Sequence, residues 1–287
     1  MEETGAVLPA AAVGATRFGR VLCAIDGTPE SFAAVEQAAT LAGPEGHLTL
    51  LAVTSYEAEG AYRGPAIGPL AVEAMLDRAT EIATAAGVSS TVDVDPTSPP
   101  SHVVLAWAAD RDLLALGAPT TSWFGAMFAG GVAAAAEARF VTPLLVARAP
   151  LAPARADGAV LVASDGHAGS EQLVMLAGEI ARGRGSRAIL VHAGGRESAR
   201  RRAAVERQAR ALEQLMEGAC ALQVEAASPH SLINETAASE GASMIVMSSR
   251  RLNGPRALGS VSRRVVHQAP CSVLLVPQEQ LLAPGNR

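Results

Sequence analysis

The sequence contains one pattern twice, and this internal repeat constrains the possible fold more than any other feature. An apolar run ends in Asp26-Gly27, and a second apolar run ends in Asp165-Gly166. Each Asp-Gly pair is followed by a helix-start signal and then by apolar residues at helical spacing. A repeat of this length gives each copy enough chain to form a domain of its own.

The repeated pattern alternates predicted strands with predicted helices. Runs that are apolar almost throughout are typical of strands in a parallel sheet that helices cover on both faces. The sequence therefore predicts an α/β protein with two tandem doubly wound, Rossmann-like domains, each with a five-stranded parallel sheet between helices. The predicted strands are 20–25, 47–53, 91–94, 112–117 and 142–146, then 159–164, 187–192, 222–226, 242–248 and 271–275. The main predicted helices are 29–42, 70–86, 170–182 and 197–217.

The domain boundaries follow from the repeat. Residues 1–18 are predicted as a flexible tail, 19–148 as the first domain and 158–278 as the second. The stretch 149–157 is rich in Pro and Ala and is the predicted linker, and 279–287 is predicted as a second tail. We expect the two domains to pack as a pseudo-dimer through their last strands, and the whole chain to form a homodimer.

Composition excludes several classes of function. All 23 basic residues are arginine, so a Walker phosphate loop, Schiff-base catalysis and a Ser-Lys dyad lack their lysine. A net charge of -5 and 3% aromatic residues do not provide the basic, stacking surface that nucleic-acid binding needs. The sequence has no window of about 18 apolar residues and an acidic start, so we expect no membrane span, no signal peptide and a cytoplasmic protein.

Metal and redox chemistry find no support in the sequence. The cysteines Cys23, Cys220 and Cys271 lie far apart, and no histidine stands at ligand spacing from any of them. We therefore expect three small buried side chains and no metal site. His167 and His192 are expected near strand ends of the second half, where a histidine with satisfied hydrogen bonds is favoured over a ligand role.

Three features together resemble the universal stress protein family in its tandem form. They are the two strand–Asp-Gly starts, the fourth strand that runs into 247–265, and the ending GSVSRRVVHQAPCSVLLVP at 259–277. The resemblance implies a phosphate loop of pattern G-x2-G-x9-G-[ST] in ATP-binding members, with the Asp after the first strand on the nucleoside. Glycines in such a loop let backbone N–H groups approach an anion, and the following helix start offers further N–H groups.

In the second half this loop departs from the family pattern. Ser248 and Arg251 stand at the first two motif glycines, whereas Gly259-Ser260 keeps the final pair. Only seven residues separate Arg251 from Gly259, which makes the loop two residues short. Arginine forks bind phosphate, so the loop offers charge where it has lost glycine. The candidate nucleotide ligands of this half are Asp165, Ser248, Ser249, Arg250, Arg251, Gly259 and Ser260.

In the first half the spacing of the loop is kept but its chemistry is not. Gly117 and Gly130 match the first and last motif glycines, while Thr120 and Gly131 replace the second Gly and the final Ser/Thr. The loop between them has no basic residue to neutralise a triphosphate. The candidate ligands of this half are Asp26, Gly117 and Gly130.

Several candidates also have an ordinary structural explanation. An Asp between a strand and a helix is a common turn or capping residue, which applies to Asp26 and Asp165. Ser260 is equally suited to cap the helix that follows it.

Three functions stay open on the sequence alone. The first is a stress-response protein with a regulatory or binding role and degraded ATP-binding motifs in both halves, without enzymatic activity. The second is a protein that binds ATP or a related adenine nucleotide through the arginine-rich loop of the second half. The third is a slow ATPase. The sequence does not identify a protein partner.

Overall fold

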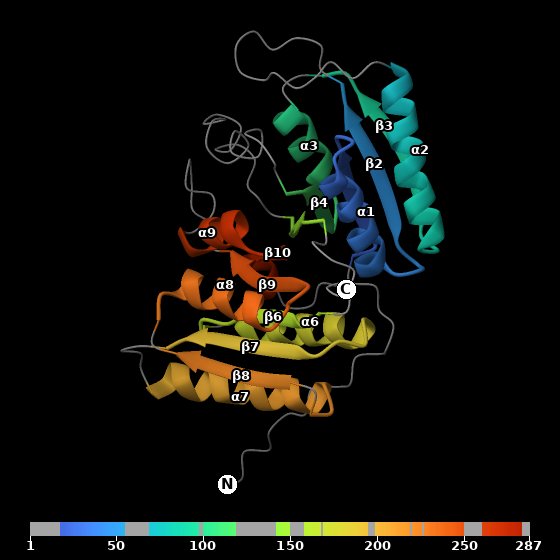
Figure 1. Cartoon of the computed structure of the whole chain (residues 1–287). Coiled ribbons are helices and arrows are strands. Elements are labelled where there is room, and N and C mark those ends of the chain that lie inside the picture. Colours follow the sequence, from blue (N-terminus) through green and yellow to red (C-terminus); the bar gives the residue numbers. More distant parts are fainter. Residues whose placement is uncertain are drawn as a thin grey trace.

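The structure is a computed structural model that describes most of the chain and contains the repeat as two similar halves (Figure 1). It describes residues 18–54, 69–97, 100–118, 142–149, 158–167, 169–194, 199–218, 220–225, 227–249 and 260–282. The first half contains β1 (Arg20–Ile25), α1 (Pro29–Ala42), β2 (His47–Val53), α2 (Pro69–Ala85), β3 (Ser89–Asp95), α3 (Pro100–Ala108), β4 (Leu113–Gly117) and β5 (Leu144–Ala147). The second half contains β6 (Val160–Ala163), α6 (Ser170–Gly183), β7 (Ala188–Ala193), α7 (Ala199–Leu215), β8 (Cys220–Glu225), α8 (Pro229–Ser239), β9 (Met244–Ser249), α9 (Ser260–Gln268), β10 (Ser272–Pro277) and α10 (Gln278–Leu282).

The strands form one sheet with the order β3-β2-β1-β4-β5-β10-β9-β6-β7-β8. Every neighbouring pair inside a half is parallel, which confirms the predicted five-stranded parallel sheets. The last strands of the two halves, β5 and β10, pair antiparallel, with Leu145 opposite Leu274. The expected contact between the halves through their last strands is therefore confirmed, and it joins both sheets into a single ten-stranded sheet.

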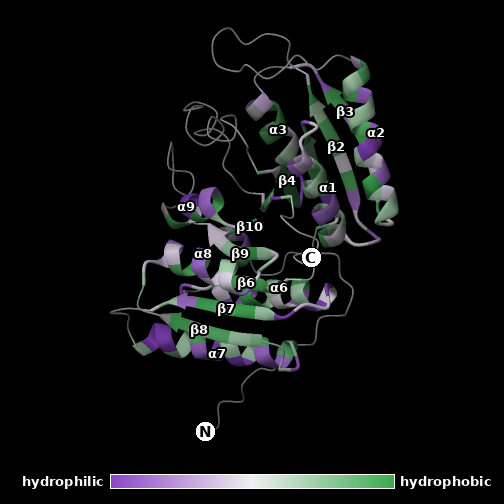
Figure 2. Ribbon diagram, viewed as in Figure 1, coloured by the Kyte–Doolittle hydropathy of each residue, from purple (hydrophilic) through white to green (hydrophobic). Residues whose placement is uncertain are grey.

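Alternating side chains of the strands supply two hydrophobic layers, one on each face of the sheet. On β1, Val21 and Cys23 belong to the layer packed by α1, α2, α6 and α7. Leu22, between them, belongs to the layer packed by α3, α8 and α9. All three are completely buried. Figure 2 shows hydrophobic residues dominating the strands and hydrophilic residues gathering on the helices, most clearly on α7. This is the two-faced burial expected of strands that read as continuous apolar runs.

Residues at the inner ends of both predicted tails belong to the folded part of the chain. Phe18, placed in the N-terminal tail, is buried in the core of the first half. The stretch predicted as a C-terminal tail begins within α10, and Leu281 of that helix is buried. Apolar side chains at both ends reach the same hydrophobic layer, which explains why the chain is held there. The linker residues 150–157 lie outside the described part.

Arg148 connects the two halves directly after β5. Its backbone N–H donates to Ser272 Oγ at 3.0 Å, and its Nη2 donates to the carbonyl of Val266 at 2.8 Å and of His267 at 3.4 Å. These carbonyls belong to the last turn of α9, where helix carbonyls have no partner inside the helix. A cation at this end also interacts favourably with the helix dipole. An arginine of the first half thus caps a helix of the second.

Gly117, at the end of β4, sits against the first turn of α1. A Cβ on this residue would lie 2.6 Å from the backbone nitrogen of Ser31 and 2.8 Å from the carbonyl carbon of Glu30. Those atoms belong to the backbone of a helix that packs on β1 and β4, so they cannot move aside cheaply. The absence of a side chain at Gly117 is therefore a packing requirement of the first half.

Replacing Arg148 tests the connection between the halves. We expect Arg148→Met to lower the free energy of unfolding by about 2 kcal/mol, because it removes charged hydrogen bonds to the end of α9. Urea unfolding followed by circular dichroism measures the change. Arg20→Met is the matched control, since Arg20 is an exposed partner of Asp112 at 3.6 Å and should cost no more than about 0.5 kcal/mol. Equal losses in the two variants would contradict a capping role for Arg148.

A methyl group at Gly117 tests the packing of β4 on α1. We expect Gly117→Ala to destabilise the protein by about 2 kcal/mol through overpacking, as measured by its thermal and urea unfolding. Gly183→Ala is the control, because a Cβ at Gly183 meets nothing within 4 Å at the end of α6. The free energy of unfolding of that variant should be unchanged or rise by up to about 1 kcal/mol, because alanine has a higher helix propensity than glycine. If Gly117→Ala is as stable as the control, the close approach is not a constraint.

Candidate functional site

The carboxyl ends of the central strands form the candidate site in each half. The strand order reverses between β1 and β4 in the first half and between β6 and β9 in the second. Parallel sheets bind ligands at such a switch point, outside the carboxyl ends of the strands. The sheet brings Asp26 next to the end of β4, and Asp165 next to the end of β9. Both predicted aspartates therefore lie at the switch point of their own half of the sheet.

Both predicted aspartates hold a turn. Asp26 Oδ1 accepts hydrogen bonds from Thr28 N at 3.0 Å and from Thr28 Oγ1 at 2.6 Å. Asp165 Oδ1 accepts from His167 N at 3.0 Å and from Ser170 Oγ at 2.9 Å. The turn role considered for both residues is thus confirmed, while contact with a nucleoside stays a prediction. Asp26 is exposed, whereas Asp165 is half-buried.

The glycine after each aspartate lets the turn close beneath a helix. Gly27 has φ +80° and Gly166 has φ +68°, a left-handed conformation that L side chains rarely adopt. A Cβ on Gly166 would also lie 3.1 Å from the carbonyl oxygen of Arg201 in α7. The Asp-Gly pair therefore places the carboxylate at the strand end while the chain turns tightly under the neighbouring helix.

The second half has a buried polar network at this point. Ser164, directly after β6, donates from Oγ to Gln208 Oε1 at 2.6 Å and accepts from Gly166 N at 3.1 Å. The Ser164 carbonyl accepts from His192 Nδ1 at 2.8 Å, which places a proton on that ring nitrogen. Gln208 and His192 are 2% and 4% exposed. The network fixes the ring of His192 and the turn that carries Asp165, in agreement with a strand-end histidine whose hydrogen bonds are satisfied.

Ser164 and Gln208 were not among the residues predicted for the site. Ser164 directly follows an apolar strand, and Gln208 stands three residues after Val205 and four before Leu212 on the buried face of α7. A polar residue in an apolar register is the sequence signal that identifies such a pair. The two residues come from segments far apart in the chain, so their contact follows only from the fold.

The first half is apolar at the equivalent positions. Ile25 stands where Ser164 stands, and Ala52, its neighbour in register on β2, stands where His192 stands. Ile25 and Ala52 are 4% and 1% exposed. The first half therefore has no polar side chain at the two buried positions where the second half has a serine and a histidine.

The helices that follow the Asp-Gly turns also start differently. Helix α1 is capped by Thr28, whose Oγ1 accepts from Ser31 N at 3.2 Å. Helix α6 starts after Gly169, which has φ +90° and makes no side-chain capping hydrogen bond. The first N–H groups of a helix attract anions when no side chain satisfies them. Helix α6 therefore begins without the side-chain cap that Thr28 provides to α1.

The predicted phosphate loop of the second half is described only at its two ends. Ser249 is buried and Ser248 half-buried at the end of β9, and α9 begins at Ser260. Ser260 is thus the first helical residue, one position further in than the capping role considered for it. Arg250, Arg251 and Gly259 lie outside the described residues, as does Gly130 of the first half. Gly117 of the first half packs directly against the backbone of α1.

Among the described residues, no group of three or more His, Cys, Asp or Glu side chains is placed to hold a metal ion. No described helix is long and apolar enough to cross a membrane. Cys23 and Cys271 are buried and Cys220 is half-buried, all three as free thiols. Burial raises the pKa of the Cys23 thiol to about 12, so it is protonated at neutral pH.

Solved structures share this two-domain architecture. A universal stress protein from Archaeoglobus fulgidus has a TM-score of 0.68 and 19% sequence identity, with 90% of this chain and 96% of that chain covered. A functionally unknown protein from Pseudomonas aeruginosa has a TM-score of 0.64 and 16% identity, with 94% and 96% covered. At these identities the likeness shows the fold. A universal stress protein from Archaeoglobus fulgidus in complex with dAMP is 26% identical and covers 42% of this chain and 97% of its own, with a TM-score of 0.32.

Sequence comparison gives the family. A search of curated proteins finds no match. The family model described as "Universal stress protein family" matches residues 17–148 and again residues 158–277. These two matches cover both halves of the sheet and include both Asp-Gly turns. The chain therefore belongs to the universal stress protein family and carries two copies of its domain in tandem.

Proposed function

We propose that this chain is a non-enzymatic regulatory protein of the stress response that binds an adenine nucleotide in its second half alone. The observation that carries this proposal is the difference between the two crevices. The second has a buried Ser164–Gln208–His192 network beside Asp165, and the first has Ile25 and Ala52 at the equivalent strand ends. Such a network holds the turn that carries Asp165 in place before a ligand arrives, which lowers the cost of binding.

The second crevice offers partners for both parts of a nucleotide. The half-buried carboxylate of Asp165 accepts hydrogen bonds from His167 N and Ser170 Oγ, and a carboxylate oriented in this way suits the hydroxyl groups of a ribose. The start of α9 at Ser260 presents backbone N–H groups and the positive end of the helix dipole to phosphates. Arg250 and Arg251, which precede α9 in sequence, would replace the missing glycines with charge.

The first half serves as a structural partner in this proposal. Gly117, the motif glycine at the end of β4, is needed for the packing of β4 against α1. Asp26 shares its oxygen between the backbone and side chain of one residue, Thr28, in an exposed turn. The buried side chains beside Asp26, those of Ile25 and Ala52, are apolar, so the first half has no counterpart of the Ser164–Gln208–His192 network. Cytoplasmic location, a homodimer and an unidentified protein partner belong to the proposal as further expectations.

Matched substitutions in the two halves test where a nucleotide binds. We expect ATP, ADP or cyclic AMP to bind with a stoichiometry of one per chain in isothermal titration calorimetry. Asp165→Asn should weaken the tightest of these ligands about tenfold or more, because a charged hydrogen-bond acceptor is lost. Asp26→Asn, the same change in the other half, should leave the affinity within a factor of two.

The controls separate binding from folding. Circular dichroism melting of both variants checks that each is folded at the temperature of the titration. A chain that gives no heat with any of the three nucleotides at millimolar concentration refutes the nucleotide proposal. Two ligands per chain, or an equal loss in the two variants, contradicts the assignment to the second half.

The absence of catalysis is a separate prediction. The sequence contains neither a GxSxG nucleophile elbow nor an HExxH motif, and no lysine is available to act on a phosphate. We expect phosphate release from ATP to stay at the rate of the buffer. The measurement is a coupled phosphate assay over several hours with wild type and Asp165→Ala. Steady release by wild type that Asp165→Ala abolishes would identify a slow ATPase instead.

A further inference from the structure

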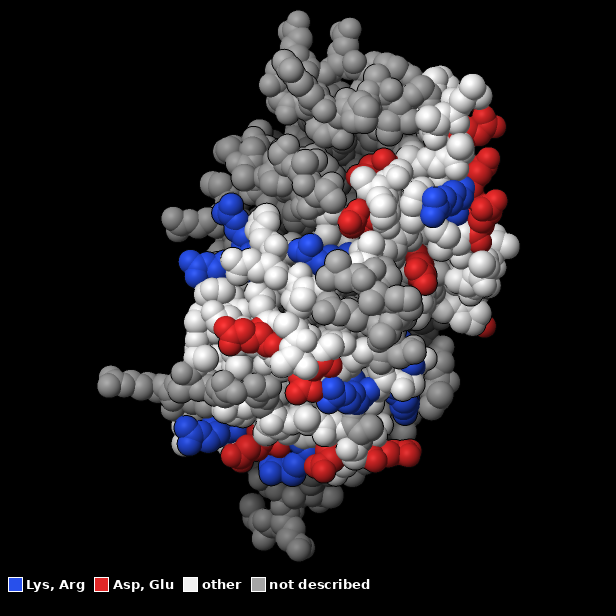
Figure 3. All heavy atoms as spheres, viewed as in Figure 1, with Lys and Arg blue, Asp and Glu red and all other residues white. Residues whose placement is uncertain are grey.

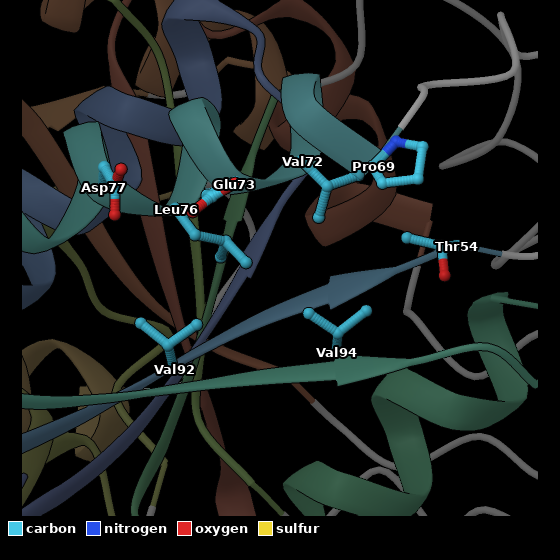
Figure 4. Close-up of a pocket in the computed structure, with 8 residues that line it drawn as sticks. All are labelled: Thr54, Pro69, Val72, Glu73, Leu76, Asp77, Val92 and Val94. Atoms are coloured by element: carbon cyan, nitrogen blue, oxygen red, sulfur yellow. The ribbon is translucent and has the colours of Figure 1, made fainter.

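A pocket of about 540 Å³ opens between α2 and the edge strand β3 of the first half (Figure 4). Val92 and Val94 of β3 point toward α2, and Val72 and Leu76 of α2 point toward β3. Glu73 and Asp77 of α2 also line the pocket, together with Thr54 and Pro69. We call this pocket the α2–β3 groove. Its volume falls within the range of small-molecule sites, which is roughly 300–1,000 Å³.

The groove leaves apolar surface uncovered in the first half. Val92 is 46% and Val94 49% exposed, although they face the side of the sheet that α2 packs on. Val72 and Leu76, across from them, are buried. A ligand that covers the two valines would remove apolar surface from water, and this is the main favourable contribution to binding in such a site.

Acidic side chains edge the groove on its helical side. Glu73 and Asp77 are four residues apart on α2, one turn along the same face, and both are exposed. Within the described part of the chain, neither carboxylate makes an ion pair. The neighbouring cation Arg78 instead lies over the ring of Phe32 in α1, with 4.5 Å between its Cζ and the ring centroid. Figure 3 shows acidic side chains gathered along the α2 side of the first half.

From this combination we infer that the α2–β3 groove binds an amphiphilic amine, a molecule with an apolar body and one positively charged nitrogen. The apolar body lies against Val92 and Val94, and the ammonium group reaches the carboxylates of Glu73 and Asp77 at the edge. Opposite charge selects the amine over an alcohol or a carboxylate with the same apolar body. This site is separate from the nucleotide crevice and does not rest on the proposed nucleotide binding.

The second half provides an internal comparison. The equivalent groove between α7 and β8 has a volume of about 330 Å³ and contains Leu222, which is 43% exposed. Its edge combines Glu206 and Glu213 with Arg210, so a cation there meets a positive charge as well. We therefore expect selectivity for an amine in the first half and none in the second.

Three probes with the same eight-carbon chain test the inference on the full-length protein. Octylamine, octanol and octanoate are titrated by calorimetry below their micellar concentrations. Octylamine should bind most tightly, octanol more weakly and octanoate most weakly. The double variant Glu73→Gln, Asp77→Asn should weaken octylamine binding about threefold and leave octanol binding unchanged, because only the charge is removed and exposed charge pairs contribute little. Val94→Ser should weaken both octylamine and octanol.

Matched controls locate the probe. Glu206→Gln with Glu213→Gln in the second groove, and Asp165→Asn in the crevice, should leave octylamine affinity unchanged. The inference is wrong if octanoate binds as tightly as octylamine, if the controls lose as much affinity as Glu73→Gln, Asp77→Asn, or if no probe binds. A variant in which a short Gly/Ser linker replaces residues 55–68 adds one more outcome. If octylamine binds only to this variant, the chain itself covers the groove, and the inference is also overturned.

Discussion

The antiparallel pair formed by β5 and β10 is the contact on which the rest of the molecule depends. Each half ends its parallel sheet in a short, wholly buried strand whose outer edge would otherwise present unpaired N–H and C=O groups. Pairing the two edges satisfies these groups and makes one continuous hydrophobic layer on each face of the sheet. We call this antiparallel pair of β5 and β10 the seam. Arg148 strengthens the seam, because it makes hydrogen bonds from the end of β5 to both β10 and α9. Among the described strands, β3 and β8 are left as the edges.

Around this seam the two copies have diverged in the place where a ligand would bind. Their strand orders and Asp-Gly turns are the same, so the fold imposes the same geometry on both crevices. The side chains differ in polarity at Ile25 and Ser164, and the helices differ in their start at Thr28 and Gly169. One copy can supply stability through packing while the other retains polar groups, since β5 and β10 hold both copies in one sheet with shared hydrophobic layers.

The fold was predictable from sequence because it depends on period and repetition. Continuous apolar runs separated by helices determine a parallel sheet, and the same order found twice determines two of them. The observed strand limits differ from the predicted ones by only a few residues, as at β3 and β9. The residues at the ends of a strand give a weaker sequence pattern than those in its middle. The buried Phe18 and Leu281 were missed for a related reason. A single apolar side chain in a loose-looking tail gives no periodic signal.

The site was predictable only in part. Asp26 and Asp165 follow directly from the repeat, and their turn hydrogen bonds are local. Gly117 resembles a phosphate-loop glycine, yet its backbone neighbours come from α1, more than eighty residues earlier in the chain. The contact between Ser164 and Gln208 is also long-range, so neither residue alone reveals the network. The sequence determines which chemical groups are available. The packing of elements far apart in the chain determines which of these groups come into contact.

Helix α9 joins the two halves in a way that has an energetic consequence. It is nine residues long, about 14 Å, with the Arg148 guanidinium of the first half at its carboxyl end and the predicted phosphate position of the second half at its amino end. A cation at one end and an anion at the other both interact favourably with the same row of peptide dipoles. Thermodynamic linkage is reciprocal, so any ligand that stabilises the amino end of α9 tightens the docking of the first half by the same factor by which that docking tightens the ligand. If a nucleotide binds at this position, its occupancy would therefore change how firmly the first half is attached to the second.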